Sequence, residues 1–273
     1  MNKAIEKQIL QIYHEVFNKV FTRKAITSLS SGSKLEAKKN IRRLKTSKEY
    51  TKFCEMFAKE LAKKGLASQR GIWRKYYAAA KATGQAVLPP TFKAYEYQVF
   101  SQAVKSNFKM IKSIPNSIMD VLQHKYMSVL IEEVAKGSIG RGSFERVLKQ
   151  HGHKNAKLIA RTETAKLQTV ILEHRATELG SVVYRWRASN DKRTRLSHRQ
   201  MNNVIVFWNF SKPILDGMQG HAGEFPNCRC TPQPIMDKDD LTNSNYKVYD
   251  YNQHKIISMT KRELLKAIEV GHL

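Results

Sequence analysis

The sequence predicts a mainly α protein with a small α+β C-terminal module, a helical N-terminal region and two or three short strands after residue 180. Two observations predict this division. Before Gly180, apolar residues recur at spacings of three and four, which is typical of amphipathic helices. After Gly180 the apolar period changes to two, which is typical of half-buried strands. The predicted organisation is a basic helical region over 1–112, a module with a helical connector over 113–236, and a C-terminal tail with a short helix over 237–273.

The first predicted helix carries an apolar stripe close to the N-terminus. The stripe consists of residues three or four positions apart, namely Ile5, Ile9, Ile12, Val16 and Val20. A serine-rich break over 28–33 follows. A second helix is predicted to begin at Ser47 and to stop at Gly65, and another covers 68–84.

The middle of the chain is predicted to form further helices that proline and glycine interrupt. One runs from Thr91 to about Lys112, before a turn that includes Pro115. The next covers 116–136. Ser143 then caps a short helix, and Gly152 separates it from the helix that follows.

Strand signals begin after Gly180. Apolar and polar residues alternate over 182–188, and 204–208 form a second apolar run. Glycine and proline between 213 and 223 indicate a surface loop. A strand-like run lies at 246–251, and the last predicted helix covers 260–270.

Positive charge is the strongest compositional signal. The chain has a net charge of +25, and residues 1–112 hold 24 Lys and Arg against 7 Asp and Glu. Such an excess favours polyanionic partners, among which nucleic acid is a better candidate than an anionic membrane surface. A solvated basic surface without a specific partner is the alternative.

Basic and aromatic side chains lie together in the predicted helix 68–84. Rings stack on bases and cations meet phosphates, although such aromatics also form the buried face of a helix. Arginine suits phosphate because its planar fork binds two oxygens at once. The candidate DNA-binding residues are Arg42, Arg43, Arg70, Arg74, Lys75, Lys81, Arg193 and Arg195.

Three cysteines do not make a disulfide framework, and Cys54 reads as a small buried residue in a helix. The charged N-terminus has no apolar stretch typical of a signal peptide, and no run is long enough to span a membrane. These features predict a protein of the reducing cytoplasm.

An ordered set of motifs lies in the second half. It consists of Arg161-Thr162-Glu163-Thr164-Ala165, a Trp-containing strand, Asp191-x-Arg193-Thr194-Arg195-x-x-His198, and Pro226-Asn227-Cys228-Arg229-Cys230. This order, over roughly residues 120–236, resembles the phage Mu F-like family of head morphogenesis proteins. That family usually has a glycine-containing turn after the histidine, where this chain has Met201-Asn202-Asn203. Asparagine tolerates a left-handed turn, so the geometry is expected to survive.

The resemblance implies a minor capsid protein of a tailed phage. Members are associated with the portal vertex, enter the procapsid in a few copies and contact the packaged DNA. The implied partners are the portal protein and double-stranded DNA, with the scaffold or major capsid protein as further candidates and no membrane. The implied location is the capsid interior at the portal vertex, with host cytoplasm during assembly, and the implied roles are head assembly and DNA packaging or ejection.

The cysteine and histidine residues of this region allow a zinc site. His198, His221, Cys228 and Cys230 would supply four ligands of the types that zinc prefers. The gap of one residue between the cysteines is shorter than usual, so the alternative is a packed cysteine pair without metal. Asp191 is expected to start a turn and to pair with an arginine, either way leaving the corner structural.

The second functional hypothesis is a metal-dependent nuclease. Asp191, His198 and His221 would hold the cation, with Glu224 as the base. The chain lacks paired carboxylates at a spacing that fixes two metals, and it lacks a nucleophile next to a base. The family resemblance supplies most of the preference for a non-enzymatic capsid protein.

Overall fold

The computed structural model describes residues 2–30, 33–82, 92–124, 141–210 and 212–270. They form a mainly α protein with a small C-terminal α+β part, as the sequence predicts. The chain divides into two compact units. We call residues 2–64 and 104–161 the helical unit, and residues 65–103 and 162–273 the sheet unit.

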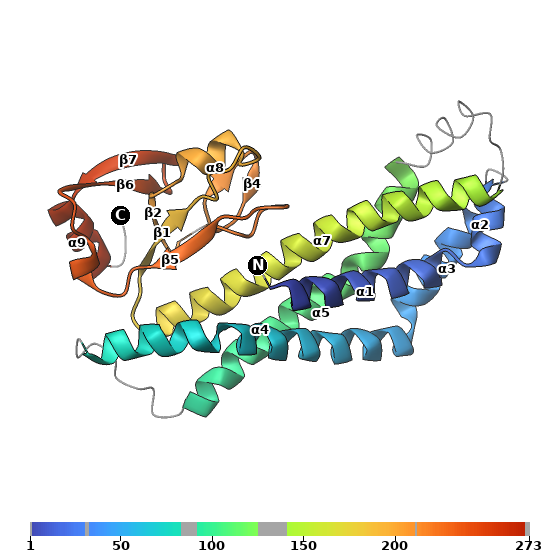
Figure 1. Cartoon of the computed structure of the whole chain (residues 1–273), viewed down its shortest axis with the longest axis horizontal. Helices are drawn as coiled ribbons and strands as arrows, with labels where there is room; N and C mark the ends of the chain where they lie inside the picture. Colours follow the sequence, from blue (N-terminus) through green and yellow to red (C-terminus); the bar gives the residue numbers. More distant parts are fainter. Residues whose placement is uncertain (1, 31–32, 83–91, 125–140, 211, 271–273) are drawn as a thin grey trace. The chain divides into compact units, whose positions relative to one another are not determined.

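Among the described residues, six helices contribute to the helical unit (Figure 1). They are α1 (Lys3–Val20), α2 (Arg23–Ser30), α3 (Leu35–Thr46), the first part of α4 (Lys48–Ala82), the second part of α5 (Phe92–His124) and the first part of α7 (Arg141–Glu178). Asn2 caps α1, since its side chain accepts hydrogen bonds from the backbone N–H groups of Ala4 and Ile5. The predicted apolar stripe of this helix is completely buried.

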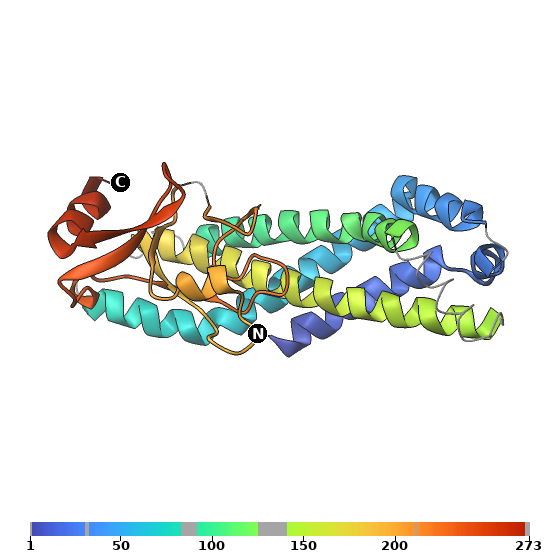
Figure 2. The same cartoon turned by 90° about the horizontal axis from the view of Figure 1, so that it is seen from above.

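Helices α1 and α7 pack side by side in opposite directions (Figures 1 and 2). Asn155 donates to the hydroxyl of Tyr13 at 3.1 Å, and further along α7 Arg161 pairs with Glu6 at 3.2 Å. Because the contact nearer the start of α1 lies further along α7, the two helices are antiparallel.

Helices α4 and α5 form a second antiparallel pair. Tyr50 donates to the carbonyl of Ile111 at 2.7 Å, and Asn107 donates to the carbonyl of Ala58 at 3.3 Å. Further side-chain contacts join α1 to α4 and α5 to α7. In the part of this unit that the structure describes, the core is therefore a bundle of four helices.

Three residues predicted to break helices lie inside them. Helix α4 continues through Gly65, α5 through Pro115, and α7 through Gly152. The predicted stop at Gly65, the turn before residue 116 and the separation at Gly152 are therefore wrong. At each position a tertiary contact outweighs the low intrinsic helix propensity of the residue.

Both glycines allow another helix to approach closely. A Cβ on Gly152 would lie 2.5 Å from the ring of Phe17, and one on Gly65 would lie 2.8 Å from Ile171. Pro115 cannot bond the carbonyl four residues earlier, which belongs to Ile111. The hydroxyl of Tyr50 satisfies that carbonyl instead.

The sheet unit is built on a five-stranded sheet of order β5-β1-β2-β6-β7, in which only β2 and β6 run parallel. Its strands are β1 (Val183–Arg187), β2 (Ile205–Phe207), β5 (Thr231–Pro234), β6 (Asn245–Asp250) and β7 (Lys255–Thr260). The unit also holds the short helix α8 (Leu196–Gln200), a 3-10 turn η1 (Lys238–Asp240), and α9 (Lys261–Val270), which packs against β6 and β7.

The strands exceed the two or three predicted. Those at 182–188, 204–208 and 246–251 appear as β1, β2 and β6, whereas β5 and β7 were not predicted. Both lie at the edges of the sheet. An edge tolerates the two prolines of β5, Pro232 and Pro234, because half of an edge strand's backbone groups need no partner strand.

The predicted surface loop over 213–223 is partly ordered and partly buried. It contains a hairpin of β3 (Ile214–Leu215) and β4 (Met218–Gln219), and its end is buried at His221 and Ala222. The core beneath it is rich in aromatic residues, among them Tyr184, Trp186 and Phe207. Among the described residues, no helix is long and apolar enough to cross a membrane.

Candidate functional site

The loop after β1 is organised by Asp191. Its carboxylate accepts from the backbone N–H of Arg193 at 2.9 Å and from the guanidinium of Arg229 at 2.6 Å. The Arg229 bond, aided by Ser189 and the Arg193 N–H, lowers the pKa of Asp191 to about 2. Asp191 thus starts a turn and pairs with an arginine, as predicted, and it ties this loop to the Cys228–Cys230 segment.

Helix α8 follows this loop and presents His198. The turn after α8 closes at Asn203, whose φ of 65° is left-handed. The backbone N–H of Asn203 donates to the carbonyl of Trp186 at 2.8 Å, and the side chain of Asn202 accepts from the backbone N–H of Ala188 at 3.1 Å. Asn203 therefore forms a left-handed turn after His198, as the sequence predicts.

The cysteine loop is held from the opposite side by helix α7. The hydroxyl of Thr162 accepts from the backbone N–H of Asn227 at 2.8 Å, and Asn227 has a φ of 55°. Thr162 is thereby the member of the Arg161-Thr162-Glu163 motif that contacts the cysteine loop directly. Its motif neighbours form ion pairs elsewhere, Arg161 with Glu6 and Glu163 with Lys166.

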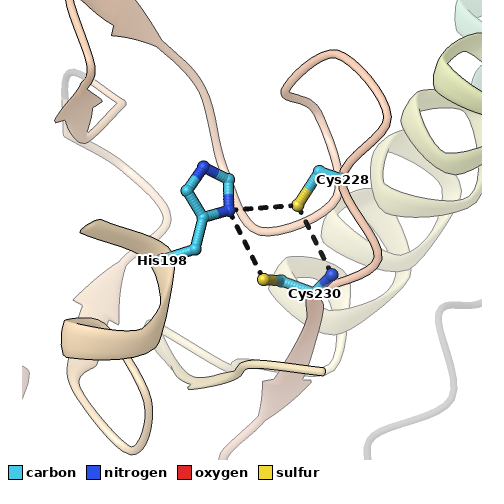
Figure 3. A group of neighbouring side chains, drawn as sticks. All are labelled: His198, Cys228 and Cys230. Atoms are coloured by element: carbon cyan, nitrogen blue, oxygen red, sulfur yellow. Dashed lines mark hydrogen bonds between the residues drawn. The ribbon is translucent and has the colours of Figure 1, made fainter. Parts of the chain in front are cut away.

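These supports bring three soft ligand atoms together (Figure 3). Nδ1 of His198 lies 3.3 Å from Sγ of Cys228 and 3.5 Å from Sγ of Cys230, and the three atoms all lie within 4.8 Å of one another. All three residues are buried. The imidazole packs edge-to-face against Phe225 and Trp186, which fixes the ring's orientation.

The two thiols hold their protons unequally. A hydrogen bond from Cys228 lowers the pKa of Cys230 to about 4, against burial and with help from His198. The same hydrogen bond, together with burial, raises the pKa of Cys228 well above its usual range. The backbone N–H of Cys230 also points at Sγ of Cys228, at 3.4 Å. The pKa values of the two thiols are therefore shifted in opposite directions, that of Cys230 down and that of Cys228 up.

The structure does not bring His221 into this group. Its Nδ1 lies 3.1 Å from the hydroxyl of Tyr184, and its Nε2 lies 3.8 Å from Glu173. Burial lowers the pKa of His221 to about 4, so the ring is neutral at pH 7. The ligand group that the described residues form therefore has three members, and the predicted fourth lies in a separate cluster.

That separate cluster contains two carboxylates that sequence reasoning did not connect. Burial raises the pKa of Glu173 to about 7. Burial also raises the pKa of Glu224. The ammonium of Lys212, at 2.7 and 2.8 Å from the two carboxylate oxygens, and the backbone N–H of His221 have the opposite and larger effect. The pKa of Glu224 therefore lies below its ordinary value. The sequence singled out only Glu224, as a candidate base. Glu173 lies in a predicted amphipathic helix, where nothing distinguishes it from a surface carboxylate.

The constellation proposed for a nuclease is not assembled among the described residues. Asp191 is paired with Arg229, His198 faces the two cysteines, and His221 belongs with Glu173 and Tyr184. Glu224, the proposed base, is bound by Lys212.

The candidate DNA-binding residues occupy three places. Arg42 and Arg43 are exposed on α3, and Arg193 and Arg195 are exposed beside the His198 corner. Arg195 also donates to the carbonyl of Pro226 at 3.0 Å. The remaining four lie on α4, and their side chains fall outside those that the structure describes, namely Arg70, Arg74, Lys75 and Lys81.

Comparison with known proteins agrees with the motif order. Residues 125–233 match the family described as Phage Mu protein F like protein. A Haemophilus influenzae protein that carries the name "Uncharacterized protein" is 30% identical over 136 residues, which are 49% of this chain and 29% of that relative. This chain thus spans less than a third of the relative's length. No solved structure matches. The family match therefore agrees with the motifs in showing that residues 125–233 of this chain are similar to the phage Mu F-like family of head morphogenesis proteins.

Proposed function

We propose that this chain is a minor capsid protein that associates with the portal vertex inside the phage head and binds packaged DNA without sequence specificity. The match of residues 125–233 to a head morphogenesis family carries the proposal. The proposed role is structural and non-enzymatic: it supports head assembly and the packaging or ejection of DNA.

The DNA contact is assigned to the helical unit, and within it first to α3. This helix buries Ala37 and Ile41 and turns its basic residues to the surface. The exposed basic residues of α3 are Lys38, Lys39, Arg42, Arg43 and Lys45. Acidic Glu36 lies in its first turn and basic residues lie in its last, so the sequence also complements the helix dipole.

Binding of this kind is expected to ignore base sequence. Cations on a helix surface meet phosphates, which carry no sequence information, and specificity needs side chains at base edges. Counterion release makes such binding fall steeply with salt.

Electrophoretic mobility shifts over a series of salt concentrations test the assignment. Replacing Lys39, Arg42 and Arg43 by Gln is expected to reduce the slope of log affinity against log salt by about 2.7, if all three contact phosphate. The matched control replaces Lys255, Arg262 and Lys266, which are exposed in the sheet unit, by Gln. Equal losses in the two triple variants would overturn the assignment to α3.

Supercoiled plasmid distinguishes binding from catalysis. Incubation with magnesium, manganese or zinc is expected to leave the DNA retarded and intact. Nicked plasmid that depends on the added metal, and on Glu224 or His221, would instead establish the nuclease.

The location at the portal needs a separate test. Antibody labelling of opened heads is expected to mark one vertex, and the purified chain is expected to bind the portal protein of the same phage. Labels distributed evenly over the shell would reject the portal assignment without affecting DNA binding.

A further inference from the structure

We propose that His198, Cys228 and Cys230 bind one zinc ion, with the fourth coordination position open to a water molecule. The inference is independent of the portal and DNA assignments, because it rests on the geometry of these three side chains. It also differs from the four-ligand set that the sequence allowed, since His221 is not a ligand.

The ligand separations fit a tetrahedral zinc site. Zinc bonds of about 2.3 Å to sulfur and about 2.0–2.1 Å to nitrogen place two such atoms about 3.6 Å apart in a tetrahedron. The two sulfur–nitrogen distances are 3.3 and 3.5 Å. Both sulfur–nitrogen distances therefore already lie close to those of a tetrahedral site.

The two thiols also hydrogen-bond to each other, yet both sulfurs converge on a single imidazole nitrogen. Both sulfurs face the same atom, Nδ1 of His198 (Figure 3). A ring nitrogen offers either one lone pair or one N–H, so it can serve only one of the two thiols well. A cation between the three atoms would engage all of them at once. We take this convergence on one nitrogen as the observation that favours a metal over a packed cysteine pair.

The site is held by groups outside the ligands. Phe225 and Trp186 fix the imidazole, Thr162 holds the cysteine loop through Asn227, and Asp191 joins that loop to the turn before α8 through Arg229. Ordered surroundings of this kind lower the cost of assembling the ligands. They also explain how a pair of cysteines only one residue apart can share an ion.

The ligand types select zinc. Thiolate and imidazole are soft or borderline ligands, which disfavour magnesium and calcium. No carboxylate of the described residues belongs to the group. Two thiolates balance the charge of the divalent ion, and each thiol gives its proton to solvent on binding.

A small cavity lies beside the three ligands and can receive the fourth ligand. Its volume is about 30 Å³, which is enough for a water molecule, and the three ligands line it together with Ser189, Thr194 and Asn227. Arg193 and Arg195 also line this cavity. A neutral water in a cationic setting completes the tetrahedron without adding a charge to the buried centre.

Elemental analysis of the full chain tests the proposal directly. Protein purified without chelator, or exposed to one equivalent of zinc and then dialysed, is expected to hold one zinc per chain. Cys228→Ser, Cys230→Ser and His198→Ala are each expected to reduce this to near zero. His221→Gln and Cys54→Ser are the matched controls and are expected to keep one zinc per chain, since neither residue belongs to the group.

Cobalt binding to the unaltered chain removes dependence on the folding of variants. Co²⁺ is expected to give a thiolate charge-transfer band and the visible bands of a tetrahedral site, and one equivalent of zinc is expected to abolish them. A folded chain that holds no zinc and gives no such bands would overturn the proposal. Retention of one zinc in the Cys228→Ser or Cys230→Ser variant, or its loss in His221→Gln alone, would also overturn the ligand set.

Discussion

At the scale of single residues, three asparagines shape the corner around His198. Asn190, Asn203 and Asn227 have φ values of 52°, 65° and 55°, and each lies next to a segment that contributes to the corner. Asn190 precedes the Asp191 turn, Asn203 follows α8, and Asn227 precedes Cys228. Asparagine reaches this left-handed region more easily than other residues with a Cβ, so these positions fix where the chain reverses.

Asn203 allows the role of its backbone to be tested. Asn203→Val is expected to reduce the free energy of unfolding by about 1–3 kcal/mol, because a β-branched residue is strained at this φ. Asn203→Gly keeps the conformation and loses the exposed hydrogen bond from Arg187, so its effect is expected to stay within about 1 kcal/mol. Urea denaturation measures both, and equal stability of the two variants would show that the turn is not held left-handed.

The sequence predicts this corner better than its surroundings. The convergence of Asp191, His198 and the two cysteines follows from turn residues and strand order, which are local signals. The position of His221 does not follow, because the contact with Glu173 depends on how α7 packs against the sheet. A sequence shows which residues can act as ligands but not which of them meet.

At the scale of elements, helix ends were predicted poorly for the same reason. Gly65, Pro115 and Gly152 have low helix propensity, yet each lies within a continuous helix. The strands were found where alternation was clear and missed at the sheet edges, where β5 contains two prolines and β7 is largely exposed. The intrinsic propensity of a residue therefore decides the secondary structure only where no packing contact compensates for it.

The compensation at Pro115 can be measured by a double-mutant cycle. Tyr50→Phe leaves the carbonyl of Ile111 buried without its hydroxyl partner, which is expected to cost about 1–3 kcal/mol of unfolding free energy. Pro115→Ala supplies a backbone N–H that can bond this carbonyl within α5. The cost of Tyr50→Phe is therefore expected to be smaller in the Pro115→Ala background. If the two costs are equal in chemical denaturation, the hydroxyl does not replace the missing helix hydrogen bond.

At the scale of the whole molecule, charge and fold are distributed differently along the chain. Basic excess is concentrated before residue 112, where helices form most of the structure. The family match covers 125–233, and the proposed zinc ligands lie in its second half. The basic residues to which our proposal assigns the DNA contact therefore lie mainly outside the segment that matches the family.

The sheet nevertheless extends beyond the matched segment. β6 pairs with β2, and the hydroxyl of Tyr251 both accepts from the backbone N–H of Phe207 and donates to its carbonyl, at 2.9 Å each. Val248 and Leu264 are completely buried in the same core. Residues after 236 are thus part of the structural core of the sheet unit rather than an appendage to it.

Truncation after Met236 tests this dependence. Removing 237–273 would expose the β2 edge and the aromatic core beneath it, and an unpaired apolar edge favours aggregation. The shortened chain is expected to lose the slow amide exchange of β1 and β2 and to aggregate, while α1 retains its protection. A chain that ends at Val270 is the control and is expected to behave as the full chain. Unchanged protection of β1 and β2 in the shorter truncation would show that the matched segment folds without β6, β7 and α9.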